Sequence, residues 1–299
     1  MPPRRRPPRR RRRRRRRPRR PPPRSRPAEA PTATRRRLDA ELVRRGLIPS
    51  RERAREAIER GEVVVAGAPA TKASRLVAPD EPIVVSGPPA RFVGRGGEKL
   101  AGALDRFGID LTDALVLDAG ASTGGFTDCA LQAGARRVVA VDVGRGQLHQ
   151  RLRVDPRVDV HERTNVRHLA PGDLGPLADA VVADLSFISL RTVTPALLGL
   201  VRDGGDLIWL VKPQFEAGRQ EASRNRGVIA DPEVWHRVLG EVAGTLRDHG
   251  AAIMGLMTSP LRGADGNVEF LLHGRTATQQ PDGVHVEALI EAVVAEAGA

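Results

Sequence analysis

The sequence is poor in the residues that build disulfide frameworks, metal sites and membrane spans. It contains one cysteine, Cys129, and seven histidines without HxxxH or CxxC grouping, so we expect neither a disulfide scaffold nor a bound metal. No apolar run approaches the roughly 18 residues of a spanning helix, and the N-terminus lacks the apolar segment of a signal peptide. These absences predict a cytoplasmic protein with no stable membrane association.

Lysine is scarce as well, although positive charge is not. Only Lys72, Lys99 and Lys212 are lysines among 49 basic residues, and the other 46 are arginines. Arginine stays protonated, whereas a lysine can become a neutral amine and accept a proton. The lysine that ends the apolar run in LVKPQF, Leu210–Phe215, is therefore a candidate for chemistry that arginine cannot perform.

Positive charge is concentrated at the N-terminus. The net charge is +13, but residues 1–37 contain nineteen arginines and one acid, so residues 38–299 carry a charge of −5. An Arg/Pro segment cannot bury a core, and we expect residues 1–37 to be a disordered arm. It is either an arm that binds RNA phosphates without sequence preference or a dispensable extension. RNA affinity of the remaining chain would require a local basic patch.

Residues 38–87 form a separate small α+β unit. Apolar spacing and a serine N-cap predict two helices, which end at Gly46 and Gly61, and short strands follow at Glu62–Ala66 and Ile83–Val85. This order resembles the small RNA-binding domain first described in a small-subunit ribosomal protein. The second helix carries the candidate RNA-binding residues Arg51, Arg53, Arg55 and Arg60. The alternative is a helical hairpin whose arginines are only solvated.

A Pro/Gly-rich linker, residues 88–96, precedes a larger domain at residues 97–283, and we expect residues 284–299 to form a C-terminal helix. In the larger domain strands alternate with helices, which predicts an α/β fold with a mostly parallel sheet. Such sheets bind ligands outside the carboxyl ends of their strands. The expected strands are Ala114–Asp118, Arg137–Asp142, Val158–His161, Ala180–Asp184, Asp206–Val211, Ala252–Met257 and Val268–Leu272, and the expected helices are Gly125–Gly134, Ser189–Val201 and Pro232–His249.

The stretch VLDAGASTGGFTD indicates a nucleoside-binding turn after the first strand. Asp118, Gly120 and Gly124 form a pattern that lets the backbone pass close to a nucleoside and places an acid to meet a ligand amine. Asp142 ends the next strand, where a carboxylate can accept hydrogen bonds from both ribose hydroxyls. Because the dinucleotide fingerprint Gly-x-Gly-x-x-Gly is absent, these residues favour S-adenosylmethionine over NAD. The alternative is that the glycines merely make a tight turn.

Two amines and two carboxylates are candidates for the chemistry. Asp184 and Lys212 end two strands, and we expect them at the same edge of the sheet. Lys99 begins the helix that enters the domain, and Glu269 starts the last strand. Such a set suits removal of a proton from a sugar hydroxyl, with carboxylates that orient the amines. A single lysine at a strand end would more often be simply solvated.

Methylation of a base is disfavoured by the same segments. Asp184–Phe187 reads DLSF instead of the Asn/Asp-Pro-Pro-aromatic motif of adenine N-methylases. Cys129 lies in the helix after the glycine turn, away from the strand ends where a thiol nucleophile would be needed. Phe187 and Phe215 each lie three residues beyond the polar residue that ends a strand, and they are candidates for stacking on a nucleotide or for packing.

Six segments in one order carry a more specific resemblance. GASTGGFTD, DVGRGQL, ERTN, VVADLSFISL, LVKPQF and GNVEF, behind an RNA-binding domain, resemble the TlyA family of ribosomal RNA 2'-O-ribose methyltransferases, also called haemolysin A. The resemblance covers roughly residues 36–285. It implies a Rossmann-like methyltransferase domain in which Lys99, Asp184, Lys212 and Glu269 form a catalytic tetrad.

The resemblance also implies the reaction and its partners. The expected reaction transfers methyl from S-adenosylmethionine to cytidine 2'-hydroxyls of ribosomal RNA in ribosomal subunits. The implied cofactor residues include Ser122, Asn165 and Asp184 besides the aspartates and glycines named above. In the linker, Phe92 replaces a tryptophan of the family pattern, and the Arg/Pro arm lies outside that pattern.

Two other classes of function stay open at this point. A non-catalytic RNA-binding factor for ribosome assembly could retain the fold, although loss of a tetrad residue would then be expected. A pore-forming haemolysin finds little support in a chain with 3% aromatic residues and no spanning segment. The Arg/Pro arm could still bind anionic membranes without specificity.

Overall fold

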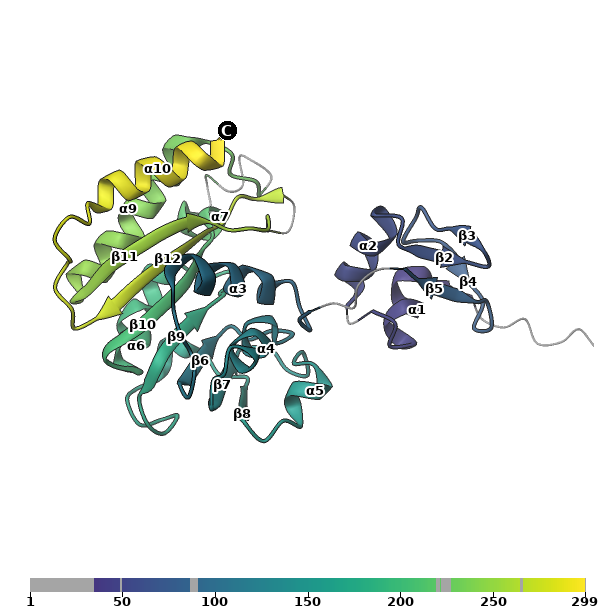
Figure 1. Ribbon diagram of the computed structural model, residues 1–299, viewed down its shortest axis with the longest axis horizontal. Coiled ribbons are helices and arrows are strands. Elements are labelled where there is room, and N and C mark those ends of the chain that lie inside the picture. Colours follow the sequence, from purple (N-terminus) through teal and green to yellow (C-terminus); the bar gives the residue numbers. More distant parts are fainter. Residues whose placement is uncertain are drawn as a thin grey trace, which may run out of the picture.

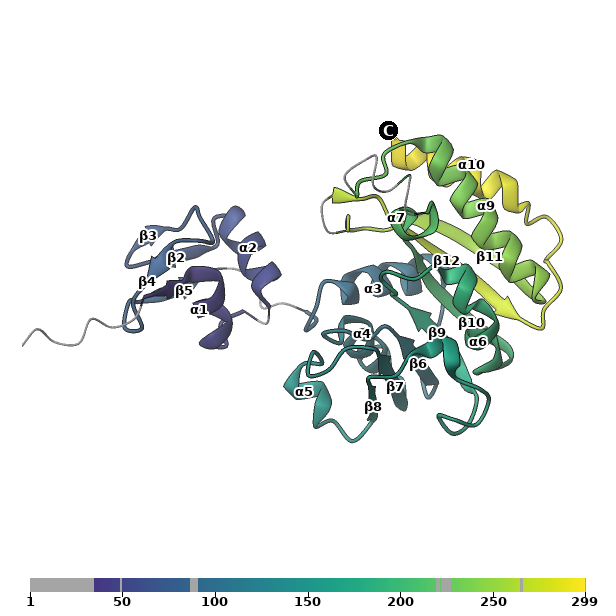
Figure 2. The same cartoon turned by 180° about the vertical axis from the view of Figure 1, so that it is seen from behind.

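The computed structural model shows a small N-terminal domain joined to a larger α/β domain (Figure 1). Figure 2 gives the same arrangement from behind. The expected arm up to residue 34 and residues 88–90 of the expected linker lie outside the described residues. The structure describes residues 35–48, 50–86, 91–218, 221, 227–263 and 266–298.

The small domain packs two helices against short antiparallel strands. The helix α2 begins where the Ser50 hydroxyl accepts a hydrogen bond from the Arg53 amide, at 3.2 Å, as the sequence predicted. Apolar side chains from both helices and the strands, among them Leu38, Ile58 and Val63, form a separate core. The elements are β1 (Arg36–Arg37), α1 (Leu38–Arg44), α2 (Arg51–Glu59), β2 (Val63–Val65), β3 (Ala68–Pro69), β4 (Leu76–Val77) and β5 (Ile83–Val85).

The large domain is built on a seven-stranded sheet in the order β11-β12-β10-β9-β6-β7-β8. Strands β10, β9, β6, β7 and β8 are parallel neighbours, and β12 is antiparallel to both β10 and β11. The prediction of a mostly parallel α/β sheet is therefore confirmed. The strands are β6 (Leu115–Ala119), β7 (Arg137–Asp142), β8 (Val158–Glu162), β9 (Ala178–Ala183), β10 (Val201–Val211), β11 (Ala251–Thr258) and β12 (Phe270–Thr276).

Helices cover both faces of this sheet (Figure 1). Alternate residues of β6 point to opposite faces, so Leu115 and Leu117 join one core while Val116 joins the other. The first core includes side chains of α6, α9 and α10, and the second includes side chains of α3, α4 and α5. The helices are α3 (Gly96–Phe107), α4 (Gly125–Gln132), α5 (Gln150–Arg153), the 3₁₀ turn η1 (Val166–His168), α6 (Leu190–Gly199), α7 (Pro213–Glu216), α9 (Pro232–Asp248) and α10 (Val286–Gly298).

The last strand differs from its expected position. It begins at Phe270, so Glu269 precedes the strand instead of starting within it, and it continues to Thr276. The extension forms because Arg275 pairs with Asp206 of β10 while Thr276 pairs with Ala251 of β11. A strand that bonds to two neighbours is prolonged by both ladders, a tertiary effect that the local sequence does not reveal.

The linker phenylalanine is part of the catalytic domain's core. Phe92 is 1% exposed and belongs to the same core as Leu100 of α3. A Cβ atom on Gly97 would lie 2.3 Å from Phe92 Cγ, so the glycine makes room for the ring. The aromatic residue at this position therefore anchors the start of α3, the helix that carries Lys99.

Candidate active site

The candidate site lies at the edge where the parallel strands end. Strand β9 ends at Ala183 and β10 at Val211, so Asp184 and Lys212 are the first residues beyond neighbouring strands. Their side chains form an ion pair, with Lys212 Nζ 2.5 Å from Asp184 Oδ1. Lys212 Nζ also donates to Ser186 Oγ at 3.1 Å. The structure thus brings together the two residues that the sequence placed at one sheet edge.

A hollow of about 520 Å³ opens beside this pair, and we call it the cofactor hollow. Five of the seven residues expected to bind the cofactor line it, whereas Asp118 and Gly124 do not. The hollow is lined by Gly120, Ser122, Val141, Asp142, Val143, Gln147, Thr164, Asn165, Val166, Asp184, Leu185, Ser186, Phe187 and Ile188. Gln147 and Thr164 were not among the predicted residues, although they lie within the segments DVGRGQL and ERTN.

Asp142 is held in a fixed position at the end of β7. Its Oδ2 accepts a hydrogen bond from the Ser122 amide at 2.8 Å, and its Oδ1 accepts one from the Gly144 amide at 2.6 Å. Each carboxylate oxygen has a second lone pair that remains available to a ligand hydroxyl. Nearby, Asn165 caps η1 by accepting from the Arg167 amide at 3.0 Å. The ribose-binding role expected for Asp142 fits this geometry.

A side chain at either glycine of the turn, Gly120 or Gly124, would clash with a different part of the domain. Both have a positive φ, +88° at Gly120 and +96° at Gly124. A Cβ on Gly120 would lie 2.6 Å from the Asp184 carbonyl oxygen, within the cofactor hollow. A Cβ on Gly124 would lie 2.2 Å from Leu152 Cδ1, in the core of the domain. Gly120 therefore shapes the ligand site, and Gly124 permits the packing of α4 against α5.

Asp118 lies near the end of β6 and is completely buried. Its Oδ2 accepts a hydrogen bond from Thr127 Oγ1 at 2.6 Å, and its Oδ1 has no hydrogen-bond partner among the described residues. Burial raises the pKa of this carboxyl from 3.8 to about 7. Because Asp118 does not line the cofactor hollow, its expected contact with a ligand amine stays a prediction.

Lys99 and Glu269 form a second ion pair, which is more enclosed than the first. The two side chains are 7% and 3% exposed. A further hollow of about 150 Å³ is lined by Lys99 and Asp184 together, along with Gly120 and Ser122. Asp184 borders both hollows and Lys99 borders the second. Lys212 and Glu269 line neither hollow, and each is connected to the site through its ion-pair partner.

Two glutamates of the small domain reach this region, although the sequence motifs did not indicate them. Arg95 at the start of α3 forms ion pairs with Glu52 and Glu56 of α2, at 2.8 and 2.7 Å. Glu52 and Arg95 also line the second hollow. The only signal in the sequence is the spacing of the two glutamates by four residues, which places them on one face of a helix. The sequence does not show that Glu52 and Glu56 pair with Arg95, because this contact forms only when the two domains dock.

The predicted RNA-binding arginines do not form one free basic face. Arg51 and Arg55 lie 3.0 and 3.7 Å from the buried carboxylate of Asp39. Arg60 is paired with Glu62 at 2.7 Å, and Arg53 Nε is buried without a hydrogen-bond partner in the described part of the chain. Arg51 and Arg55 therefore share one carboxylate, whereas Arg60 has its own partner and Arg53 is partly buried.

The carboxylate of Asp39 forms ion pairs with three guanidinium groups. Arg37 joins Arg51 and Arg55 and bonds to the carboxylate at 3.0 Å. Burial alone would raise the pKa of Asp39, but hydrogen bonds from Arg37 and Arg51 lower it to about 2. One negative charge against three positive charges leaves an excess of two positive charges at this surface.

Comparison with known proteins identifies the class that this fold and site define. Residues 92–276 match the FtsJ-like methyltransferase family, and residues 36–83 match the S4 domain. The family match spans more than half of the chain, and the chain is an FtsJ-like methyltransferase with an N-terminal S4 domain. S-adenosylmethionine is the cofactor of such an enzyme. Five of the seven residues predicted to bind it line the cofactor hollow.

Relatives over nearly full length narrow the class further. The chain is 49% identical to the 16S/23S rRNA (cytidine-2'-O)-methyltransferase TlyA of Mycobacterium tuberculosis, over 83% of this chain and 92% of that one. It is 37% identical to Hemolysin A of Brachyspira hyodysenteriae, over 79% of this chain and 98% of that one. The protein belongs to the TlyA family, as the sequence motifs indicated.

A solved structure supports the same grouping. A protein from Streptococcus thermophilus described as a hemolysin superimposes with a TM-score of 0.72 at 39% identity, covering 88% of this chain and 95% of that one. Despite the haemolysin names, no helix within the described residues is both long and apolar enough to cross a bilayer.

Proposed function

We propose that this protein transfers methyl from S-adenosylmethionine to the 2'-hydroxyl of cytidine in the ribosomal RNA of ribosomal subunits, and that it does so in the cytoplasm. The observation that carries the proposal is the ion pair between Lys212 and Asp184 at the rim of the cofactor hollow. A 2'-hydroxyl is a weak nucleophile that needs a nearby proton acceptor. The nucleotide specificity is taken from the relative in Mycobacterium tuberculosis.

In the proposed mechanism the Lys212 ammonium first releases a proton to solvent, and the neutral amine then removes the proton of the ribose hydroxyl. When bound, the cofactor supplies an electrophilic methyl group on a sulfonium. Asp184, 2.5 Å from Lys212 Nζ, holds the amine at the rim and takes up part of its charge after proton transfer. Lys99 lines the second hollow together with Asp184, and its positive charge offsets the negative charge that develops on the ribose oxygen. Glu269 holds Lys99 in place through their ion pair.

A pair of aromatic rings marks where the target base would lie. Phe187 is 92% exposed, which is unusual for a phenylalanine, and its φ of +64° is strained for a residue with a Cβ atom. Its ring lies 5.2 Å from that of Phe215, between centroids. Because Phe187 also lines the cofactor hollow, stacking on the cytosine would hold the ribose near Lys212.

RNA would dock on the small domain through the arginines around Asp39. Their side chains are about half exposed and carry more positive charge than Asp39 neutralises. Phosphate oxygens can then share the guanidinium groups with Asp39, since each guanidinium has five donors. Arg60 is a weaker candidate because Glu62 already neutralises it.

The direct test combines purified protein, radiolabelled S-adenosylmethionine and separately isolated, unmodified ribosomal subunits. The rRNA is then digested, and the labelled nucleoside is identified. Label in 2'-O-methylcytidine from one or both subunits is the expected result. Cofactor binding without label on either subunit would contradict the proposal and favour a non-catalytic assembly factor. Label in another nucleoside would refute the cytidine assignment alone.

A further inference from the structure

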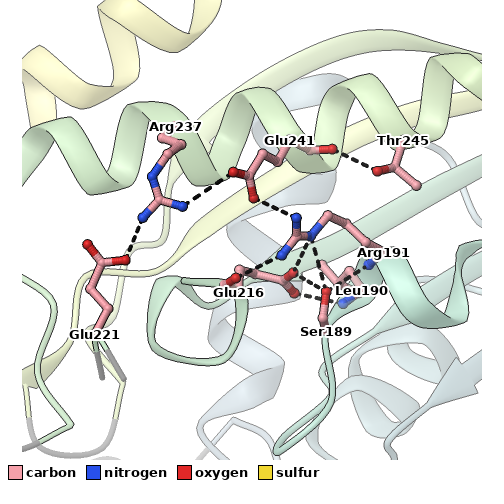
Figure 3. A network of polar contacts seen from close by, with 8 residues as sticks. All are labelled: Ser189, Leu190, Arg191, Glu216, Glu221, Arg237, Glu241 and Thr245. Atoms are coloured by element: carbon pink, nitrogen blue, oxygen red, sulfur yellow. Dashed lines mark hydrogen bonds and ion pairs between the residues drawn. The ribbon is translucent and has the colours of Figure 1, made fainter. Parts of the chain in front are cut away.

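One buried carboxylate, Glu216, connects two of the segments that carry candidate active-site residues, and Figure 3 shows its contacts. Glu216 ends α7, four residues after Lys212, and is 3% exposed. Its Oε1 accepts a hydrogen bond from the Leu190 amide at 2.7 Å, and its Oε2 accepts one from the Ser189 hydroxyl. Ser189 and Leu190 form the start of α6, so this side chain binds the first turn of one helix to the last residue of another.

The loop between β9 and α6 carries several of the groups proposed to act in catalysis. It begins at Asp184, whose amide donates to the Ala119 carbonyl oxygen at 3.0 Å, and it ends at Ser189. Between these points lie Ser186, which accepts from Lys212, and the strained, exposed Phe187. Glu216 is the buried contact that holds the far end of this loop.

The opposing segment carries Lys212 and Phe215, while Lys99 and Glu269 lie elsewhere in the domain. Lys212 and Phe215 precede Glu216 in one short stretch, and the Phe215 amide donates to the Lys212 carbonyl oxygen at 2.9 Å. The ion pair from Lys212 to Asp184 and the contact of Phe215 with Phe187 both cross between the two segments. The distances in this ion pair and this ring contact therefore depend on the relative position of the two segments.

Arg191 contacts Glu216 and is itself bonded to a second carboxylate, that of Glu241. Arg191 Nε lies 3.6 Å from Glu216 Oε2, and another nitrogen of Arg191 donates to the Glu216 carbonyl oxygen at 2.9 Å. Arg191 also bonds to Glu241 of α9 at 2.6 Å, and Arg237 reaches the same glutamate (Figure 3). A carboxylate in such a network keeps one rotamer, because moving it would leave several buried groups unsatisfied.

We infer that Glu216 is a positioning residue for methyl transfer, which sets the distance between the Lys212–Asp184 pair and the nucleotide held by Phe187. It touches neither cofactor nor substrate in this role. The inference rests on the proposed function, because Lys212 and Phe187 are assigned there. Removal of the Glu216 carboxylate is expected to lower kcat about 10- to 100-fold, the cost of a small misplacement of reacting groups.

Cofactor binding should respond much less than kcat. Asp142, Asn165 and Gly120 line the cofactor hollow from β7, η1 and the glycine turn, and none of them bonds to Glu216. We therefore expect the Kd for S-adenosylmethionine to stay within about threefold. A general loss of folding would weaken cofactor binding and kcat together.

The experiment compares Glu216→Ala with Glu216→Gln in the full-length protein. A glutamine can accept from the Leu190 amide through its carbonyl oxygen and donate to Ser189 Oγ through its amide, so it should restore most of kcat. Asp206→Ala is the matched control, since Asp206 is a carboxylate bonded to Arg275 and His273 in the middle of β10, away from Glu216. The measurements are kcat, subunit KM, cofactor Kd and hydrogen exchange of the peptide that contains Leu190.

The expected result is a selective fall in kcat for Glu216→Ala, with rescue by Glu216→Gln and faster exchange at the start of α6. A kcat within twofold of the wild type would overturn the inference. So would an equal loss in Asp206→Ala, or a loss that glutamine does not rescue. If the wild type itself transfers no methyl, the proposed function fails, and the exchange measurement still reports whether Glu216 holds the loop.

Discussion

The catalytic domain encloses its lysines, whereas the small domain leaves the arginines around Asp39 open. Lys99 and Lys212 have side chains that are 7% and 11% exposed, and each is paired with one carboxylate. Arg51 and Arg55 are 53% and 55% exposed and share Asp39 with a third arginine. The enclosed pairs are balanced in charge, and the open cluster has a positive excess.

This contrast follows from how charge behaves in the two environments. An ion pair removed from water has a fixed geometry and leaves a costly unpaired charge when one partner is lost. An exposed arginine is screened and can exchange one anion for another at little cost. The enclosed lysines suit a single chemical step, and the open arginines suit reversible contact with an RNA backbone.

The largest effect is expected from Lys212→Arg. The variant keeps the positive charge next to Asp184 but loses the ability to accept a proton, so methyl transfer should fall about 10²- to 10⁴-fold. Lys72→Arg is the control, because Lys72 is exposed in the small domain and should leave the rate unchanged. The measurement is initial methylation rate with saturating cofactor; an active Lys212→Arg enzyme would remove Lys212 from the role of base.

Glu269→Gln tests whether the second pair is truly enclosed. The change leaves the Lys99 ammonium without its partner in a buried position, which is expected to cost about 3–5 kcal/mol of unfolding free energy. Asp159→Asn, which breaks the exposed pair with Arg137, should cost less than about 1 kcal/mol. Urea denaturation of the three proteins gives the comparison. Equal costs would show that the two environments do not differ as proposed.

Asp118 is a third enclosed group, but unlike Glu269 and Asp184 it is not paired with a lysine in the described part of the chain. Burial raises its pKa from 3.8 to about 7, so between these pH values the folded protein binds more protons at this group than the unfolded chain does. The contribution of Asp118 to stability is therefore expected to decrease as pH rises through this window. Asp118→Asn removes the titration. The variant should gain stability relative to the wild type from pH 4 to pH 7.

Urea denaturation at several pH values measures this difference. Thr127→Val serves as a second variant, since it removes the hydrogen bond to Asp118 and keeps the carboxyl. It should retain a pH dependence of the same sign as the wild type. A difference between wild type and Asp118→Asn that does not change with pH would contradict the raised pKa.

The smallest effects are expected among the open arginines. Arg51→Gln combined with Arg55→Gln should weaken RNA binding and reduce the slope of log K against log salt by up to about 2. Arg60→Gln should change the slope little, because Glu62 already neutralises Arg60. Binding of an rRNA fragment, measured over a range of salt concentrations, separates the two variants. Equal slopes would mean that pairing within the domain does not decide which arginines reach RNA.

Much of the architecture was readable from local patterns. The alternation of strands and helices, the Ser50 cap and the order of the motifs predicted both domains, and the strand ends predicted that Asp184 and Lys212 would share an edge. Each of these features depends on residues close in sequence or on the general geometry of parallel sheets. The cofactor hollow likewise contains five of the seven residues expected from the motifs.

Other features depend on contacts between distant segments. Glu269 meets Lys99 across 170 positions, and Arg95 meets Glu52 and Glu56 through the docking of two domains. Glu216 appears in the sequence as the residue after LVKPQF, with no local sign that it bonds to the start of α6. None of these pairings follows from spacing along the chain.

Periodicity, capping and motif order are local properties, so they were enough to predict the fold class, the family and the candidate site residues. Which charges are enclosed and which are open became visible only in the folded chain. Burial and ion pairing depend on every segment that packs around a side chain, and that environment separates the lysines of the catalytic domain from the arginines of the small one.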